Sequence, residues 1–367
     1  MLKKVLAILL CAALLVSVSA CSNSSESKKA QLSVTKAPAA EAKKDALGIT
    51  IGPIAGKTDK DYKLGGVFGG MNPYSEPMPG AANQATKELG IPNADFQQPQ
   101  KWDQNEQNAI LDGLVSKGIK GIYMMPSNAV AGNEEIGKLV DANIPVVCVG
   151  GPPELPSKAT LTLATDVFNS AYQGTMYVIK AMGGKGKVVG LSGAVSDPNT
   201  QKRFAAIKKA CKDSKVELLQ NIGDIDNSEG SMTAVENLLS ANGAQIGGII
   251  STAYYPSLAL AVLLKDKKYS HIKAVGIDTD PKVLQAIKDG TMLGTMSQNP
   301  WGQAYIGIKT LKMLADGWKY KSGKPAIVDS GSFFINKSNI NTVDKTVKAV
   351  TDKLLATWTN NFTPPAK

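Results

Sequence analysis

Residues 105–125 read NEQNAILDGLVSKGIKGIYMM and join a helical pattern to a strand pattern. The first half repeats apolar residues at the three- and four-residue spacing of an amphipathic helix: Ile110, Leu111, Leu114 and Val115. Lys117 and Gly118 follow as a typical helix C-terminus. Residues 121–125 are then a short apolar run of the kind that forms a buried strand. The stretch therefore predicts one helix–strand unit of a parallel α/β sheet.

The same alternation repeats along the chain. Further strand-like runs are Leu64–Phe68, Pro145–Val149, Lys187–Leu191, Gly247–Ile250 and Ala274–Ile277. Further helix-like stretches are Asn169–Met182, Thr200–Asp213, Glu229–Ala241 and Pro281–Asp289. Short buried strands that alternate with amphipathic helices favour βαβ units and parallel sheets. About nine such units are more than one open sheet holds, so we expect an α/β fold of two doubly wound parallel-sheet lobes joined by a hinge.

Four parts of the chain follow from this pattern. We expect a signal peptide at 1–20 and a flexible, polar tether at 21–61, within which the more apolar 47–55 docks on the body. The first lobe is expected at 62–165 plus 299–328, and the second at 166–298 plus 329–357.

The N-terminus has the pattern of an export signal. Lys3 and Lys4 precede the uncharged apolar run 5–18, which is too short to span a bilayer comfortably. The following Val18-Ser19-Ala20-Cys21 resembles the lipobox of bacterial lipoproteins. That resemblance implies cleavage before Cys21, lipidation of its thiol and acylation of the new N-terminus with a fatty acid such as palmitate. We expect attachment to the extracytoplasmic face of the cell membrane, or a periplasmic location. The alternative is an ordinary secretory signal in which Cys21 is incidental.

Composition excludes several classes of protein. The chain has 367 residues, 43% of them hydrophobic and 20% charged, which excludes disorder and a polytopic membrane protein. The chain has a single histidine, His271, so it cannot form a multi-histidine metal site, and most hydrolase hypotheses are weakened. The net charge of +10 comes from scattered lysines, so we expect no nucleic-acid partner. Cys148 and Cys211 are expected as buried core residues and not as a disulfide.

Two stretches approach catalytic motifs without meeting them. Residues 190–194, GLSGA, come near a nucleophile elbow but end in Ala and have no well-placed histidine partner. Residues 183–187, GGKGK, lack the spacing of a phosphate-binding loop. We therefore expect no enzyme, no cofactor and no metal.

Polar side chains follow most of the expected strands. They are amides, carboxylates, hydroxyls and aromatics, as in 72–75 (NPYS), 126–128 (PSN), 278–280 (DTD) and 297–301 (SQNPW). Ligands of such sheets collect at the carboxyl ends of the strands. These groups suit a neutral polyhydroxylated ligand, whose hydroxyls need both donors and acceptors.

Several segments together resemble one family, the type I periplasmic substrate-binding proteins of the ribose-, galactose- and xylose-binding group. They are 72–74 (NPY) after the first strand, 119–126 (IKGIYMMP), 142–147 (ANIPVV), 275–278 (VGID) and 295–298 (TMSQ). The resemblance covers about Lys63 to Ser338. Each segment alone is weak, but their order and spacing agree.

The resemblance implies sugar-contacting roles for Asn72, Arg203, Asp278 and Gln298, with Tyr74 as a stacking ring. Asp278 would accept from two hydroxyls, and Arg203 would donate as a fixed fork. We add Tyr254 as a second aromatic of the site.

Each of these roles has a structural alternative. Asp278 would instead cap the helix that starts near Pro281, and Arg203 would be an ordinary salt-bridge residue. Gln298 would serve the hinge as well as the ligand, and Tyr254 would be a core or rim aromatic.

The chain also departs from the ribose binders. Gly150-Gly151 stands where they carry an acidic–basic pair, Ile225 where they carry a phenylalanine, and Ala253 where they carry an asparagine. The pocket is therefore expected to be larger than theirs or shaped for another ligand.

The expected function is a monomeric, lipid-anchored receptor that captures a sugar-like ligand and delivers it to the permease of an ABC importer. One alternative is a sensory receptor that presents ligand to a chemotaxis or histidine-kinase system. Another is a carbohydrate-acting lipoprotein enzyme.

Overall fold

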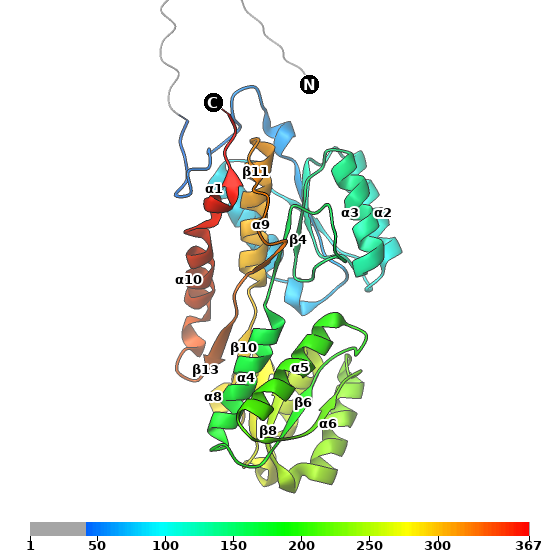
Figure 1. Cartoon of the computed structure of the whole chain (residues 1–367), viewed down its shortest axis with the longest axis vertical. Helices are drawn as coiled ribbons and strands as arrows, with labels where there is room; N and C mark the ends of the chain where they lie inside the picture. Colours follow the sequence, from blue (N-terminus) through cyan, green and yellow to red (C-terminus); the bar gives the residue numbers. More distant parts are fainter. Residues whose placement is uncertain (1–41, 367) are drawn as a thin grey trace, which may run out of the picture. The chain divides into compact units, whose positions relative to one another are not determined.

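The computed structural model describes residues 42–366. This part of the chain forms two six-stranded sheets and a two-stranded ribbon, with helices between the strands (Figure 1). The predicted α/β fold with two doubly wound lobes is confirmed. The predicted signal peptide 1–20, the lipidation site Cys21 and the start of the tether lie outside the described residues.

The first sheet is entirely parallel, in the order β12-β5-β4-β3-β1-β2. Its strands are β1 (Leu64–Val67), β2 (Asp95–Gln97), β3 (Gly121–Met124), β4 (Val146–Val149), β5 (Leu161–Ala164) and β12 (Ile327–Asp329). One face packs on α1 (Met78–Leu89) and α9 (Pro300–Ala315), and the other on α2 (Gln104–Ser116) and α3 (Ala129–Asp141) (Figure 1). Because both faces are covered, β1, β3, β4 and β5 are buried at every position.

The second sheet has the order β13-β10-β9-β8-β6-β7, and only β13 is antiparallel. Its strands are β6 (Lys187–Leu191), β7 (Glu217–Ile222), β8 (Ile246–Ser251), β9 (Lys273–Ile277), β10 (Gly294–Ser297) and β13 (Phe333–Asn336). Helices α4 (Val167–Ala181) and α5 (Pro198–Asp213) cover one face; α6 (Ser228–Asn242), α7 (Tyr254–Leu263) and α8 (Pro281–Asp289) cover the other. Within residues 42–366, no helix combines the length and apolarity needed to cross a membrane.

Three segments connect the two sheets. The chain leaves the first sheet at 165–166, between β5 and α4, and returns at 298–299, between β10 and α9. It crosses again at 330–332, between β12 and β13. Asp329 Oδ1 accepts from the Asp166 N–H at 3.0 Å, so the first and third crossings are tied to each other.

Part of the segment that was expected to be a tether, residues 42–61, packs on the first sheet. Within the predicted tether, Ile49 is fully buried and belongs to the hydrophobic core of the first sheet. Asp45 accepts from the buried Lys309 ammonium on α9 at 2.9 Å. Tyr62, the first residue of the expected first lobe, donates to Asp316 at 2.7 Å. The segment 42–61 is therefore folded against the first sheet, around the apolar stretch 47–55, and is no tether there.

The C-terminal segment departs from the expected lobe division. Residues 329–357 were assigned to the second lobe, and β13 and the start of α10 (Val343–Leu355) do contact its core through Val343. Leu355, however, belongs to the core of the first sheet, as do Trp358 and Phe362 after it. Phe362 also lies in the ribbon formed by β11 (Lys319–Tyr320) and β14 (Phe362–Thr363). The prediction is wrong for the end of this segment because α10 runs from one core to the other.

Candidate functional site

Most residues expected at the site lie just beyond the carboxyl ends of parallel strands. Asn72 and Tyr74 follow β1 in the first sheet. In the second sheet, Asp278 follows β9, Gln298 follows β10, and Tyr254 begins the helix after β8. These strand ends are where an open α/β sheet positions ligand-contacting groups.

Asn72 and Tyr74 are held in a short turn. The Asn72 side chain accepts from the Tyr74 N–H at 2.8 Å and so caps the 3-10 helix η2 (Pro73–Ser75). The Tyr74 hydroxyl donates to Gln303 Oε1 at 2.9 Å, and its ring lies 6.0 Å from that of Phe68. Because its proton is committed to Gln303, the Tyr74 oxygen can only accept from a ligand.

A buried polar chain continues from Tyr74 into the hinge. Gln303 on α9 is fully buried, and its Nε2 donates to the Ser330 hydroxyl at 2.8 Å. Asn299 Nδ2 donates to the Ser330 carbonyl at 3.0 Å. The ring of Tyr74 is thus held, through Gln303, by two of the three segments that connect the sheets.

Asp278 occupies a backbone conformation that side-chain-bearing residues rarely adopt. Its φ is 65°, in the left-handed region. The Asp278 N–H donates to the Met296 carbonyl at 2.9 Å, and the Thr295 hydroxyl donates to the Asp278 carbonyl at 2.8 Å. Gln298 Nε2 donates to Asp278 Oδ1 at 3.0 Å, which orients the carboxylate. A residue held in this way against backbone preference points to a functional constraint.

Asp278 is not a helix cap. The residue that caps α8 is Asp280, whose side chain accepts from the Lys282 N–H at 2.7 Å. The structural alternative for Asp278 is therefore wrong, since the capping position lies two residues further along.

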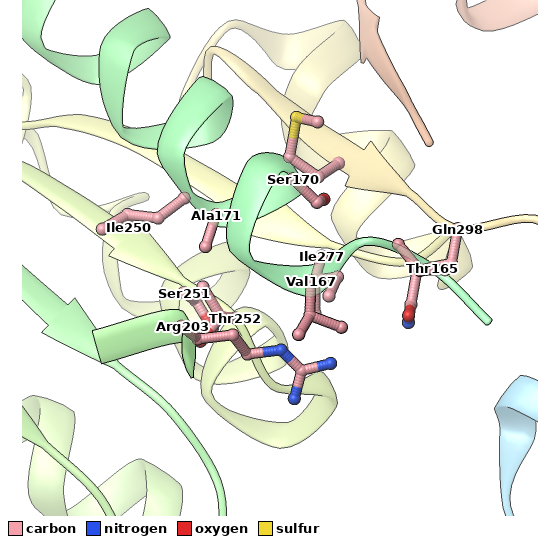
Figure 2. Close-up of a pocket in the computed structure, with 11 residues that line it drawn as sticks. Thr165, Val167, Ser170, Ala171, Arg203, Ile250, Ser251, Thr252, Ile277 and Gln298 are labelled. Atoms are coloured by element: carbon pink, nitrogen blue, oxygen red, sulfur yellow. The ribbon is translucent and has the colours of Figure 1, made fainter. Parts of the chain in front are cut away.

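Arg203 extends from α5 into a narrow cavity (Figure 2). It forms no ion pair with any other residue of the described part of the chain, which argues against the ordinary salt-bridge alternative. Burial lowers the pKa of its guanidinium, and the negative charges of Asp197 and Asp278 oppose that shift. The guanidinium stays charged, since its pKa starts so far above neutrality.

Charged groups of the second sheet act on Tyr74 of the first. Burial raises the pKa of the Tyr74 phenol well above its usual value; Asp278 adds to the rise and Arg203 opposes it. Burial also raises the pKa of the Asp278 carboxyl, against the hydrogen bond from Gln298 and the charge of Arg203. The structure therefore brings Tyr74, Arg203, Asp278 and Gln298 within electrostatic reach of one another.

Tyr254 is placed differently. Its hydroxyl donates to Asp280 Oδ2 at 2.5 Å, and its ring packs edge to face on Tyr255 at 5.3 Å. It is not among the residues that line the cavity beside Arg203. This position fits the rim-aromatic alternative better than a ring inside the pocket.

The cavity has a volume of about 10 Å³, roughly the room of one water molecule. It is lined by Thr165, Val167, Ser170, Ala171, Arg203, Ile250, Ser251, Thr252, Ile277, Met296 and Gln298 (Figure 2). The sequence reasoning missed its hydroxyl-bearing residues. Single Thr and Ser residues beside apolar runs carry no signal of their own, although position after a strand would have indicated Ser251 and Thr252.

The loop after β4 carries no polar side chain toward the site. A Cβ on Gly150 would lie 2.8 Å from the Met125 sulfur, and one on Gly151 would lie 2.8 Å from the Met125 methyl. Gly150 also has a φ of 74°, which favours glycine. Methionine thus takes the space that a side chain on these glycines would need.

The second sheet contributes one further carboxylate that the sequence reasoning missed. Ile225 is a buried core residue, but Asp226 beside it lies within electrostatic reach of Arg203. Burial raises the pKa of the Asp226 carboxyl; the charge of Asp197 adds to this shift and Arg203 opposes it. Asp197, Asp226 and Asp278 thus all lie within electrostatic reach of the Arg203 guanidinium.

Comparison with known proteins identifies the class to which this fold and site belong. A family model described as a periplasmic binding protein domain matches residues 68–319. The chain belongs to this family, which is made up of extracytoplasmic substrate-binding proteins and not of enzymes, and the predicted resemblance is confirmed.

Individual relatives are distant. The chain is 25% identical to a xylitol-binding protein of Mycolicibacterium smegmatis over 256 residues, which is 69% of this chain and 71% of that protein. The structure is similar to a sugar-binding protein of a sugar ABC transporter from Bacillus halodurans, with a TM-score of 0.70, 20% identity, and coverage of 76% and 98% of the two chains. It is equally similar to a solute-binding protein from Burkholderia graminis in complex with D-arabinose, with a TM-score of 0.70, 21% identity, and coverage of 78% and 99%.

Proposed function

We propose that the chain captures a sugar or sugar-like polyol between its two lobes. The observation that carries this proposal is the unpaired Arg203 guanidinium beside the Asp278 carboxylate, with the Tyr74 ring contributed by the other sheet. A fixed cationic donor and a fixed anionic acceptor match the paired hydroxyls of a sugar. The similar proteins, among them a xylitol-binding protein and a solute-binding protein in complex with D-arabinose, point the same way.

The proposed ligand contacts follow from the hydrogen bonds already made. Gln298 uses its Nε2 on Asp278 Oδ1, which leaves its carbonyl oxygen for a ligand hydroxyl. Asn72 uses its Oδ1 within the turn, which leaves its amide group as a donor. We retain Asn72, Tyr74, Arg203, Asp278 and Gln298 as ligand-binding residues, and place Tyr254 at the rim.

The lobes are proposed to close on the ligand as two bodies. The three crossing segments 165–166, 298–299 and 330–332 form the hinge. We assign β12 to the first lobe and β13 to the second, as the sheets divide. Closure about such a hinge lets each lobe complete half of the hydrogen-bonding shell.

The proposed partner is the permease of an ABC importer, which would receive the ligand from the closed form. A similar solved structure is that of a sugar-binding protein of a sugar ABC transporter. We expect the receptor to act as a monomer.

Anchoring through Cys21 remains part of the proposal. The sequence Val18-Ser19-Ala20-Cys21 after the uncharged run 5–18 supports it. Two acyl chains are sufficient for stable membrane attachment where one is marginal. Cys21→Ala should therefore move the protein from the membrane fraction to the soluble fraction without a change in ligand affinity; an Ala variant that still requires detergent would contradict the anchor.

A thermal-shift panel tests the ligand class. Pentoses, hexoses, polyols and disaccharides are added one at a time, with amino acids as a control set. A ligand at 100 times its dissociation constant should stabilise the protein by about 2.7 kcal/mol. Stabilisation by a saccharide or polyol supports the proposal; stabilisation by amino acids alone, or by none of the panel, overturns it.

A further inference from the structure

A second cavity lies beside the proposed sugar site. Its volume is about 240 Å³. It opens around the first and third crossing segments, and its walls include Pro152, Phe168, Asn199, Lys202, Ile327 and Asp329. None of these residues belongs to the site described above.

The two cavities share a wall. Thr165 and Val167 line both of them. Thr165 is 7% exposed, and its Oγ1 lies within reach of the Tyr74 hydroxyl but makes no hydrogen bond of normal geometry among residues 42–366. A ligand hydroxyl at the junction would supply the well-aligned partner that this buried hydroxyl lacks. Thr165 thus lies where a ligand bound between the lobes, beside Arg203, would reach the second cavity.

Two carboxylates supply acceptors in the second cavity. Asp329 Oδ1 accepts from the Asp166 and Gly331 N–H groups at 3.0 and 2.9 Å. Asp166 Oδ1 accepts from the Asn169 N–H at 2.9 Å, which caps α4. Each carboxylate is fixed through one oxygen, and no hydrogen bond from the described part of the chain reaches the other. Fixed acceptors of this kind suit sugar hydroxyls.

Donors come from the first two turns of α5. Asn199 and Lys202 line the second cavity, and Lys202 forms no ion pair with the rest of residues 42–366. Arg203, the next residue along the helix, lines the first cavity. One helix therefore presents donors to both cavities at once.

Apolar side chains remain exposed at the same place. Phe168 is 36% exposed and Ile327 is 38% exposed. An exposed aromatic ring beside fixed carboxylates and an ammonium group matches a pyranose or furanose ring, whose C–H face packs on the aromatic ring while its hydroxyls reach the polar groups.

The loop after β4 presents no polar side chain between Tyr74 and the second cavity. A Cβ on Gly150 would lie 2.8 Å from the Met125 sulfur and 3.5 Å from the Tyr74 ring, and Pro152, two residues further along, lines the second cavity. No polar side chain of residues 150–153 would therefore terminate a ligand after its first ring.

We propose that the natural ligand has two sugar rings. The first ring lies among Tyr74, Arg203 and Asp278, and the second occupies the 240 Å³ cavity against Phe168, with Lys202 donating to it. The Thr165 hydroxyl contacts the ligand where the two rings join. This inference rests on the proposed function and narrows its substrate class from sugars to disaccharides.

Calorimetric titration of the full chain tests the inference. The probes are D-xylose, D-arabinose, D-ribose, D-glucose and D-galactose, together with xylobiose, cellobiose, maltose and lactose. The variants are Phe168→Ala and Lys202→Ala. Their matched controls are Tyr177→Ala, an exposed aromatic on the same helix α4, and Lys208→Ala, an exposed lysine on α5.

We expect at least one disaccharide to bind tenfold or more tightly than its own single ring. Phe168→Ala should remove most of that gain, and Lys202→Ala should weaken disaccharide binding about fivefold. Both variants should bind single sugars within twofold of the wild type. The two controls should leave both affinities unchanged.

Tight binding of single sugars with weaker or no binding of every disaccharide overturns this inference and leaves the proposed function intact. Equal losses in Phe168→Ala and Tyr177→Ala overturn it as well. Binding of no saccharide overturns the proposed function, and the inference falls with it.

Discussion

The two lobes present unlike faces to the proposed ligand. On the first lobe, the Tyr74 hydroxyl donates its proton to the buried Gln303. The loop at Gly150-Gly151, which lies beside Met125, has no side chain with which to contact a ligand. On the second lobe, Arg203 forms no ion pair within residues 42–366, and Asp278 accepts one side-chain hydrogen bond, from Gln298. We therefore expect the first lobe to contribute mainly shape and the second to contribute most of the binding energy.

Removing a charge from the second-lobe face should have the largest effect. Asp278→Asn tolerates the left-handed backbone, removes the charge and replaces one acceptor oxygen with a donor nitrogen. Hydrogen bonds to charged groups contribute about 1.5–3 kcal/mol each, so the dissociation constant of the bound sugar should rise tenfold to a hundredfold. The melting temperature without ligand should stay the same or increase, because burial disfavours this carboxylate.

Asp280→Ala is the matched control for that variant. It removes the true cap of α8 and should cost about 1 kcal/mol of unfolding free energy with a much smaller change in affinity. If Asp278→Asn instead behaves like Asp280→Ala, the second-lobe face does not bind the ligand through this carboxylate.

Acid pH should weaken binding by a smaller amount. Burial raises the pKa of Asp278, and that of Asp226 beside Arg203, above the usual aspartate range. A group whose pKa is higher in the folded than in the unfolded protein binds protons on folding. As the pH falls through the raised pKa, these two groups therefore increase the free energy of unfolding of the unliganded protein. The same protonation removes an acceptor from the sugar.

Titrations from pH 7 to pH 4.5 should therefore show affinity falling severalfold in the wild type and clearly less in Asp278→Asn. Melting experiments over the same range compare the free energy of unfolding of the two proteins. The difference should shift in favour of the wild type as the pH falls, because only the wild type has the Asp278 carboxyl with its raised pKa. An identical pH dependence of affinity in both proteins would exclude Asp278 as the titrating acceptor.

The first-lobe face should respond least in affinity. Tyr74→Phe keeps the ring but leaves Gln303 Oε1 buried without its donor, which should cost about 1–3 kcal/mol of unfolding free energy. Sugar affinity should fall less than threefold. Chemical denaturation and calorimetry on the same variant separate the two effects, and a loss of affinity as large as that of Asp278→Asn would remove the contrast between the faces.

How far the sequence predicts this fold depends on where each strand lies. Interior strands such as β3, β4 and β6 are near-continuous apolar runs, so their bounds were predicted within about one residue. The edge strands β2 and β7 were missed because they are polar and only partly buried, and the interior strand β5 was missed because its four residues include Thr162. The end of α10 was misassigned because an amphipathic helix does not reveal which core it packs against.

The site shows a similar limit. The pattern of an apolar run followed by a polar residue indicated Asp278 and Gln298. It could not indicate Gln303, which lies inside a helix, or Thr165, whose role depends on two cavities meeting. It also offered Asp278 as the cap of α8, whereas the cap is Asp280, because the backbone turns at Asp278 and only the Asp280 side chain accepts from a helix N–H.

The most direct test of the central claim is small-angle X-ray scattering with and without the saccharide that binds best in the panel. If the ligand is held between Tyr74 of one lobe and Arg203 and Asp278 of the other, saturation should reduce the radius of gyration of the wild type. Asp278→Asn should show the same compaction only at ten- to a hundredfold higher sugar concentration. A saturated complex with an unchanged radius of gyration would contradict capture between two closing lobes.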